Sequence, residues 1–222
     1  MYIKKYNILF LHIPKTAGSS VTKYMEYLGG DDYYQKTLPS DFSCSKWVET
    51  YTHLPLKYYN EFLTDEQVES AIKFTVIRNP LDRLKSWYFY NKIKGWVDLP
   101  INKFLPQIYK EINLLLERGY CLDYTNRNNC GSLYNTLGIM KQSDFFDSND
   151  NISLLKFENL QIDFNKFVSK YNLPKYDIPN INPSVQISRQ KFTKEMVLGH
   201  SKHMLNFVLD YYSTDFEIWK KL

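Results

Sequence analysis

Short apolar runs alternate with amphipathic segments along this chain. Residues 8–13, 72–77 and 153–157 are apolar runs of strand length, and the second is rich in β-branched and aromatic residues. Residues 46–52 alternate between apolar and polar and predict a further short strand. Because strands that alternate with helices form mainly parallel sheets covered on both faces, this pattern predicts an α/β fold.

Start and stop signals place the helices between these strands. After the first strand, apolar residues at helical spacing lead to Gly29 and Gly30, which end a helix. Thr64 and Gln67 have the spacing of a capping box at the start of a helix over residues 63–70, and Pro80 begins another. Further helices are predicted over residues 100–118, 162–171, 193–212 and 216–219, and loops over residues 31–45, 120–131 and 174–183.

Length, composition and charge limit the class of protein. The chain has 222 residues, 44% of them hydrophobic, and no repeat or Gly/Ser linker divides it, so we expect one domain over residues 1–222. The net charge of +4 suits an anionic ligand but is too small to indicate nucleic-acid binding. The first apolar run is too short for a signal peptide or a membrane span, so we expect a soluble protein, cytoplasmic or similarly located.

The cysteines leave two alternatives open. Cys44, Cys121 and Cys130 form no CxxC motif and no metal-ligand array with the four histidines. Cys121 and Cys130 are either free thiols in a reducing compartment, which we favour, or a disulfide.

The loop after the first strand has the composition of an anion-binding site. Pro14 ends the strand, and the next residues supply an ammonium group, hydroxyl groups and a glycine: Lys15, Thr16, Ala17, Gly18, Ser19 and Ser20. A helix begins there, so its unpaired N–H groups and the positive end of its dipole face the loop. The segment predicts either a cradle for phosphate or a similar anion, or an ordinary strand-to-helix turn with a hydroxyl cap.

The strand over residues 72–77 ends at a second cation. Arg78 stands at the strand end, and Ser86 lies eight residues later, about two turns along the next helix, so the pair is expected to flank a groove. A P-loop kinase would need the GxxxxGK[ST] order in the first loop and an acidic residue for Mg²⁺ near the second strand. Here Lys15 precedes Gly18, and Arg78 stands in place of the acid. The pattern predicts a site that binds negative charge without a metal.

These two segments together resemble the cofactor signatures of the sulfotransferases. HIPKTAGSS and VIRNPLDRLKSWY are similar to the paired motifs of the branch that includes the heparan-type carbohydrate O-sulfotransferases. YTHLP with His53, KFENL over residues 156–160 and DYYSTDFEIW over residues 210–219 resemble further family segments in the same order. The resemblance implies a P-loop-NTPase-like, three-layer α/β/α fold with a mainly parallel central sheet.

The resemblance also implies a ligand and the residues that bind it. The donor would be 3′-phosphoadenosine 5′-phosphosulfate (PAPS), the product 3′,5′-ADP (PAP), and the acceptor a hydroxyl group, expected on a glycan. The first loop would hold the 5′-phosphosulfate, with Lys15 at the leaving oxygen, while Arg78 and Ser86 would hold the 3′-phosphate. Family members have a mobile basic loop near the position of Arg189 and Lys191, which here either closes over the nucleotide or forms an exposed basic turn.

The acceptor hydroxyl must lose a proton, and His53 is the expected base. An unperturbed imidazole has a pKa near about 6.5 and is largely neutral at pH 7. Thr52 stands where many family members have a glycine before this histidine, and some members use a glutamate instead. Glu26 and Glu49 are therefore alternatives to His53.

Two other classes of function stay open at this point. A P-loop-type nucleotide kinase would bind Mg²⁺–ATP, and a non-enzymatic module would bind polyanions through basic and aromatic residues. No motif determines the acceptor or the oligomeric state.

Overall fold

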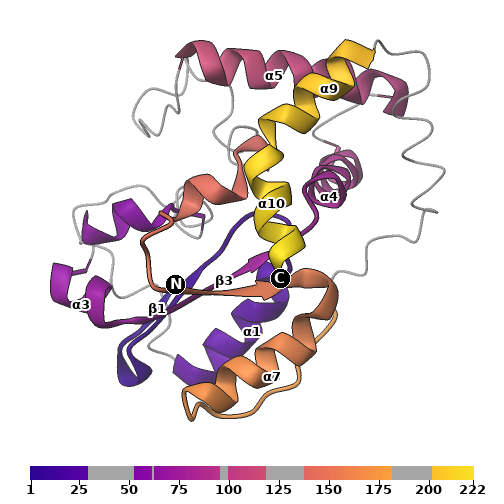
Figure 1. Ribbon diagram of the computed structural model, residues 1–222. Helices are drawn as coiled ribbons and strands as arrows, with labels where there is room; N and C mark the ends of the chain where they lie inside the picture. Colours follow the sequence, from indigo (N-terminus) through magenta and orange to yellow (C-terminus); the bar gives the residue numbers. More distant parts are fainter. Residues whose placement is uncertain (30–52, 62, 96–99, 119–137, 182–201) are drawn as a thin grey trace. The chain divides into compact units, whose positions relative to one another are not determined.

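The computed structural model describes residues 1–29, 53–61, 63–95, 100–118, 138–181 and 202–222 (Figure 1). These residues divide into two compact units. The sheet unit comprises Met1–Asn79, Gln142–Asn182 and Trp219–Leu222, and the helical unit comprises Pro80–Lys141 and Pro183–Ile218. Each unit is built from segments distant in the sequence. Whether residues 1–222 behave as one domain, as the sequence predicts, stays a prediction.

The sheet has four strands in the order β1-β2-β3-β4. The strands are β1 (Tyr2–Ile3), β2 (Ile8–Leu11), β3 (Ile72–Ile77) and β4 (Ile152–Lys156). β2, β3 and β4 run parallel, while the short β1 runs antiparallel to β2. The predicted α/β class with a mainly parallel sheet is confirmed. β1 was not predicted, because two residues are too few to show a period, and the predicted strand over residues 46–52 lies outside the described residues.

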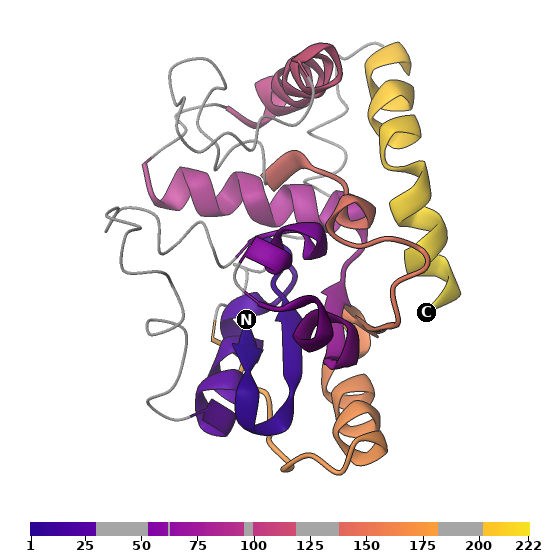
Figure 2. The same cartoon turned by 90° about the vertical axis from the view of Figure 1, so that its left-hand side faces the viewer.

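Two helices of the sheet unit, α1 (Gly18–Gly29) and α7 (Leu160–Lys170), lie side by side in Figures 1 and 2. Their contact includes Tyr24 and Phe164, whose ring centroids are 4.6 Å apart. Phe10 of β2 and Phe74 of β3 stack at 4.9 Å in the same buried cluster. This apolar layer holds the strand ends that carry the candidate site.

Shorter elements complete the sheet unit. The capping box predicted at Thr64 is present, with Thr64 Oγ1 accepting from Gln67 N and Gln67 Oε1 accepting from Thr64 N. It begins α3 (Asp65–Ser70). The remaining elements are short 3₁₀ segments: η1 (Lys4–Tyr6), η3 (Leu56–Glu61), η5 (Gln142–Phe145) and η6 (Phe157–Asn159). The sequence pattern did not predict η5.

The helical unit has its own apolar core. Its described elements are α4 (Pro80–Ile93), η4 (Ile101–Lys103), α5 (Phe104–Arg118) and α9 (Lys202–Tyr211), and α10 (Ser213–Lys221) leads from this unit back to the sheet unit. Trp87, Phe104 and Val208 pack in one buried cluster. Arg83 is also buried, and its Nη1 donates to Met140 O at 2.6 Å. No helix among the described residues is long and apolar enough to cross a membrane.

Candidate active site

The loop between β2 and α1 is held in a tight, left-handed conformation. Lys15 and Ala17 have φ values of 69° and 70°, a region that non-glycine residues seldom occupy. Thr16 between them is fully buried, and its hydroxyl donates to Ile13 O at 2.9 Å. Ser20 N then donates to Ala17 O at 2.9 Å, which starts the first helical turn. The loop composition suggested that the Thr16 hydroxyl would donate to an anion. In the structure this hydroxyl instead donates to Ile13 O and stabilises the loop.

Gly18 is required because the His12 ring lies directly over its α-carbon. A β-carbon at Gly18 would lie only 1.5 Å from His12 Nε2. The His12 ring is stacked on Phe10, and its buried Nδ1 has no hydrogen-bond partner among the described residues. Burial, and next to it the neighbouring His53, lowers the pKa of His12 well below its usual value, so His12 is neutral at pH 7. The His12 ring packs between Phe10 of β2 and Gly18 at the start of α1.

His53 lies against the same loop. Its Nδ1 is 2.8 Å from His12 O, and the two imidazole rings meet edge to face with centroids 4.3 Å apart. Since a carbonyl oxygen only accepts, Nδ1 must carry the hydrogen of the neutral ring. The lone pair then resides on Nε2, which is the atom that a general base needs.

Arg78 links the end of β3 to this loop. Its side chain is 7% exposed, its Nη1 donates to Lys15 O at 3.1 Å, and its guanidinium carbon lies 4.1 Å from the centre of the Phe157 ring. Burial, followed by the charge of Arg78, lowers the pKa of Lys15 to about 8. Two cationic side chains thus share one region with little water, where an anion would relieve their mutual repulsion.

The main chain at Arg78 and Asn79 is held by side chains from distant segments. Gln142 is fully buried; its Oε1 accepts from Arg78 N at 2.9 Å and its Nε2 donates to Arg78 O at 2.8 Å. Glu158 accepts from Asn79 N at 3.2 Å with one oxygen and from Trp219 Nε1 at 3.0 Å with the other. No sequence signal pointed to Gln142, because its partner is 64 residues away. Glu158 and Trp219 did lie in segments that the family resemblance singled out.

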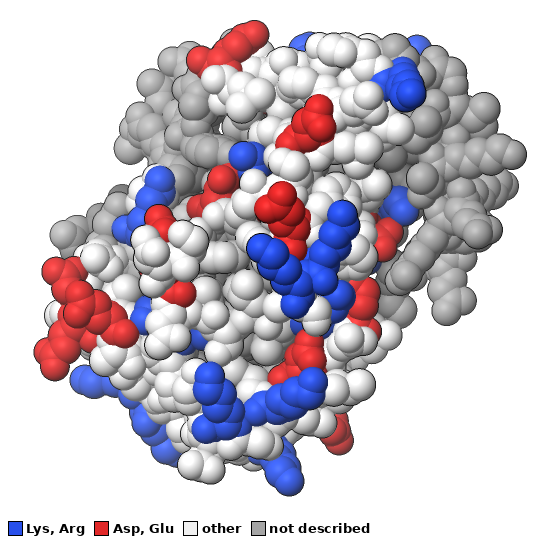
Figure 3. All heavy atoms as spheres, in the orientation of Figure 1, with Lys and Arg blue, Asp and Glu red and all other residues white. Residues whose placement is uncertain are grey.

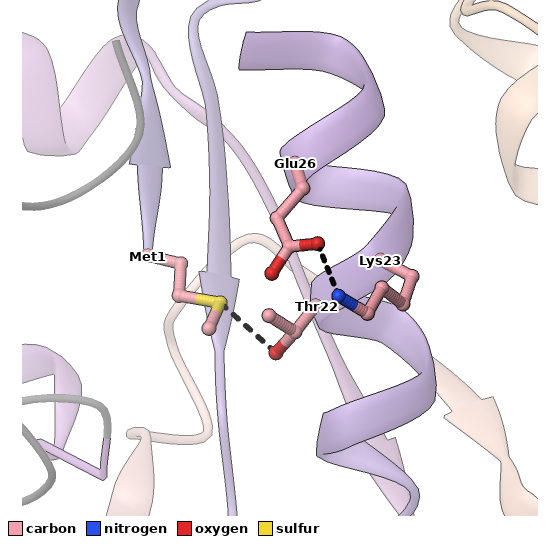
Figure 4. A network of polar contacts seen from close by, with 4 residues as sticks. All are labelled: Met1, Thr22, Lys23 and Glu26. Carbon is pink, nitrogen blue, oxygen red and sulfur yellow. Dashed lines mark hydrogen bonds and ion pairs between the residues drawn. The ribbon is translucent and has the colours of Figure 1, made fainter. Parts of the chain in front are cut away.

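Glu26, one alternative base, lies about two helical turns from the loop. It lies on α1 eight residues after Gly18, which is about 12 Å along the helix. Figure 4 shows its carboxylate directed at Lys23, with which it forms an exposed ion pair at 2.7 Å. The second alternative, Glu49, lies outside the described residues. Among the described candidates, His53 has the better position.

The comparison with protein families agrees with this geometry. The model of the sulfotransferase family matches residues 1–221. The chain belongs to the sulfotransferase family. No curated protein and no solved structure matches the chain. Sulfotransferases have a P-loop-like fold, so the family match confirms the predicted fold class together with the mainly parallel sheet.

Several predicted site residues of this sulfotransferase are not brought together by the described structure. Ser86 lies on α4 in the helical unit and is half-buried, whereas Arg78 belongs to the sheet unit, so their pairing stays a prediction. Ser19 is exposed and Ser20 is buried at the start of α1. Arg189, Lys191 and the three cysteines lie outside the described residues.

Two features of the sulfotransferase bear on ligands away from this loop. Within the described segments, no group of three or more His, Cys, Asp or Glu residues is placed to hold a metal ion. A cavity of about 550 Å³ is lined by Lys73 and Asn151, which lie near the amino ends of β3 and β4, together with residues of η5. Parallel sheets bind ligands at the opposite, carboxyl ends of the strands, where Lys15 and Arg78 lie.

Proposed function

We propose that this sulfotransferase transfers the sulfuryl group of PAPS to an acceptor hydroxyl, on a carbohydrate, with no metal in the chemical step. The observation that carries the proposal is the hydrogen bond of 3.1 Å between Arg78 Nη1 and Lys15 O. It links the Arg78 guanidinium at the end of β3 to the main chain of the Lys15 loop, which follows the neighbouring parallel strand β2. PAPS carries phosphate groups at both ends of one adenosine, so it needs two separate anion sites, whereas a nucleotide with only a 5′ chain needs one.

In this proposal Lys15 stabilises the leaving group. In sulfuryl transfer the bond between sulfur and the 5′-phosphate oxygen breaks while the acceptor oxygen bonds to sulfur from the opposite side, much as in phosphoryl transfer. The electron pair of the broken bond stays on the phosphate, which leaves as PAP. The Lys15 ammonium and the N–H groups at the start of α1 neutralise that negative charge as it develops.

His53 takes the proton of the acceptor hydroxyl. Its Nδ1 hydrogen is engaged by His12 O at 2.8 Å, which fixes the ring and leaves the basic lone pair on Nε2. This arrangement resembles other sites in which a backbone carbonyl selects the tautomer of a working histidine. Proton transfer to Nε2 balances the transfer of the sulfuryl group to the acceptor oxygen.

Calorimetric titration tests the donor. We expect adenosine 3′,5′-bisphosphate to bind more tightly than ADP or Mg²⁺–ATP, and this preference to be lost in Arg78→Ala. Lys166→Ala removes an equal charge from an exposed position on α7 and serves as the control. Equal or tighter binding of ATP would reject the donor in favour of a kinase, and salt-sensitive binding without nucleotide preference would favour a polyanion-binding module.

The surface charge bears on the last alternative. Acidic side chains lie among the basic ones on the face drawn in Figure 3. Such mixed charge is a poor match for a long polyanion, which needs a continuous basic stripe.

A screen of purified protein with labelled donor against glycans, lipids and small alcohols would identify the acceptor.

A further inference from the structure

We propose that Gln142 is a positioning residue of the donor site: it fixes the main chain of Arg78 and thereby sets the affinity for the 3′-phosphate. The inference deepens the function proposed above and rests on it. Gln142 does not itself contact the ligand in this proposal, since both ends of its side-chain amide are engaged by Arg78.

Gln142 takes the place of a strand partner at the point where the sheet ends. Ile77 is paired with Lys156 of β4, and Arg78 is the next residue along the chain. There the Gln142 amide supplies both a donor and an acceptor, at 2.8 and 2.9 Å, to the carbonyl and N–H groups of Arg78. Because two hydrogen bonds to one residue fix its main chain in both position and tilt, the direction of the Arg78 side chain is fixed at its root.

Two further contacts fix the other end of the Arg78 side chain. The guanidinium carbon lies over the Phe157 ring at 4.1 Å, and Lys15 O accepts from Nη1 at 3.1 Å. Phe157 follows β4 directly, so it and Gln142 approach Arg78 from different segments of the sheet unit. With root and tip both held, the remaining N–H groups of the guanidinium have one orientation, which is what bidentate recognition of a phosphate requires.

The alternative role for Gln142 is purely structural. A fully buried glutamine that satisfies two backbone groups stabilises the fold wherever it occurs, and its removal leaves both groups without partners. The two roles differ in ligand dependence. A positioning role through Arg78 affects ligands that carry a 3′-phosphate, whereas general loosening of the sheet edge affects every nucleotide alike.

The experiment compares two ligands in folded variants of the full chain. Dissociation constants are measured for adenosine 3′,5′-bisphosphate and for adenosine 5′-phosphate, which lacks the 3′-phosphate. We expect Gln142→Leu to weaken bisphosphate binding about tenfold and to leave 5′-phosphate binding within about twofold. In an Arg78→Ala background, Gln142→Leu should cause no additional loss, because residues that act through one group are not additive.

A matched control exists on α7. Gln161 also holds a main-chain segment through its amide, accepting from Ile178 N at 2.8 Å and donating to Tyr176 O at 3.3 Å. Gln161→Leu removes the same kind of contact away from Arg78 and should change neither dissociation constant. If Gln142→Leu does not fold, as judged by circular dichroism, Gln142→Asn keeps the amide but shortens its reach and replaces it in the comparison.

Every outcome of this experiment either supports or overturns the positioning role of Gln142. Equal weakening of both ligands, additive loss in the Arg78→Ala background, unchanged bisphosphate binding, or failure of both Gln142 variants to fold would overturn the positioning role while leaving the proposed function intact. A wild-type protein that does not prefer the bisphosphate to the 5′-phosphate would overturn both proposals.

Discussion

The ends of β2 and β3 both carry a cation, but they hold it by different means. After β2, the chain folds back on itself: Lys15 and Ala17 adopt left-handed conformations, and Thr16 bonds to Ile13 O within the same loop. After β3, the chain passes almost at once from Arg78 into α4. The orientation of Arg78 depends instead on contacts that arrive from distant segments, made by Gln142, Phe157 and, through Asn79, Glu158.

This difference separates two tasks of a donor site. A contiguous loop with N–H groups and one lysine holds fixed donors at the point where negative charge develops during reaction, which suits the leaving phosphate. A buried arginine held from several sides is better suited to a charge that does not change, such as a 3′-phosphate. Loss of the first should affect turnover as well as affinity, whereas loss of the second should affect affinity alone, since uniform binding changes affinity without changing the chemical step.

The largest expected effect concerns His53, the proposed general base beside the loop after β2. His53→Ala should lower turnover about 10²–10⁴-fold, because it removes the proposed general base and such a group contributes an effect of that order. The affinity for adenosine 3′,5′-bisphosphate should stay nearly unchanged. Steady-state rates with labelled donor and calorimetry measure the two quantities. His203→Ala, on α9 in the helical unit, is the control, and wild-type turnover in His53→Ala would remove this residue from the mechanism.

The next effect tests whether the first strand end depends on close packing. Gly18→Ala should weaken bisphosphate binding about 10²-fold, because the added methyl group would lie 1.5 Å from His12 Nε2 and one of the two must move. The double variant His12→Ala/Gly18→Ala should recover part of the affinity by removing the ring. If the double variant binds no better than Gly18→Ala, the overlap with His12 is not the reason for the glycine.

The affinity for bisphosphate should depend on pH through Lys15, with a change of about tenfold, but not through Arg78. Lys15 has a pKa lowered to about 8, so it loses its proton above that pH in the free protein, whereas a bound phosphate favours the ammonium form. The affinity for bisphosphate should therefore fall at least about tenfold between about pH 7 and 9.5. Lys15→Arg keeps its charge throughout this range, so its affinity should stay nearly constant.

The stability of the free protein should rise with pH where the affinity for bisphosphate falls. It therefore gives an independent check on the lowered pKa of Lys15. Because the pKa of Lys15 is lower in the folded state than the ordinary lysine value of 10.5, the unfolded chain binds more protons between about pH 8 and 10.5. The Lys15 contribution to stability should therefore rise with pH in that window. The difference in melting temperature between the wild type and Lys15→Arg isolates this contribution, and a difference that is constant with pH would contradict the lowered pKa.

The smallest effect probes the outer support of the second strand end. Glu158→Gln keeps one acceptor oxygen but presents an NH₂ group to either Asn79 N or Trp219 Nε1, so one of the two hydrogen bonds is lost. We expect a loss of about 0.5–1.5 kcal/mol in stability and about threefold weaker bisphosphate binding. Thermal unfolding and calorimetry measure these changes. Glu66→Gln, on an exposed face of α3, should change neither, and a larger effect on turnover than on affinity would break the proposed division of tasks.

The features that depend on neighbouring residues were predictable from the sequence. The strand over residues 72–77 and the capping box at Thr64 are confirmed, because β-branched runs and caps act within a few residues. In α7, the apolar residues Phe164, Phe167 and Val168 stand at helical spacing and are all buried. The requirement for glycine at position 18 was not predictable from the loop composition, because the group that lies against it is the ring of His12.

The sequence by itself determined the two strand ends with their cations and, through the motifs at those ends, the family. The tertiary structure decided what holds each cation: the hydroxyl of Thr16 turned inward to Ile13, and Gln142 became the partner of Arg78 from 64 residues away. The physical reason is the separation along the sequence of the residues that interact. Helix periods, caps and loop composition are fixed by residues a few positions apart, whereas the partner of a buried main-chain group is fixed only when the sheet has assembled.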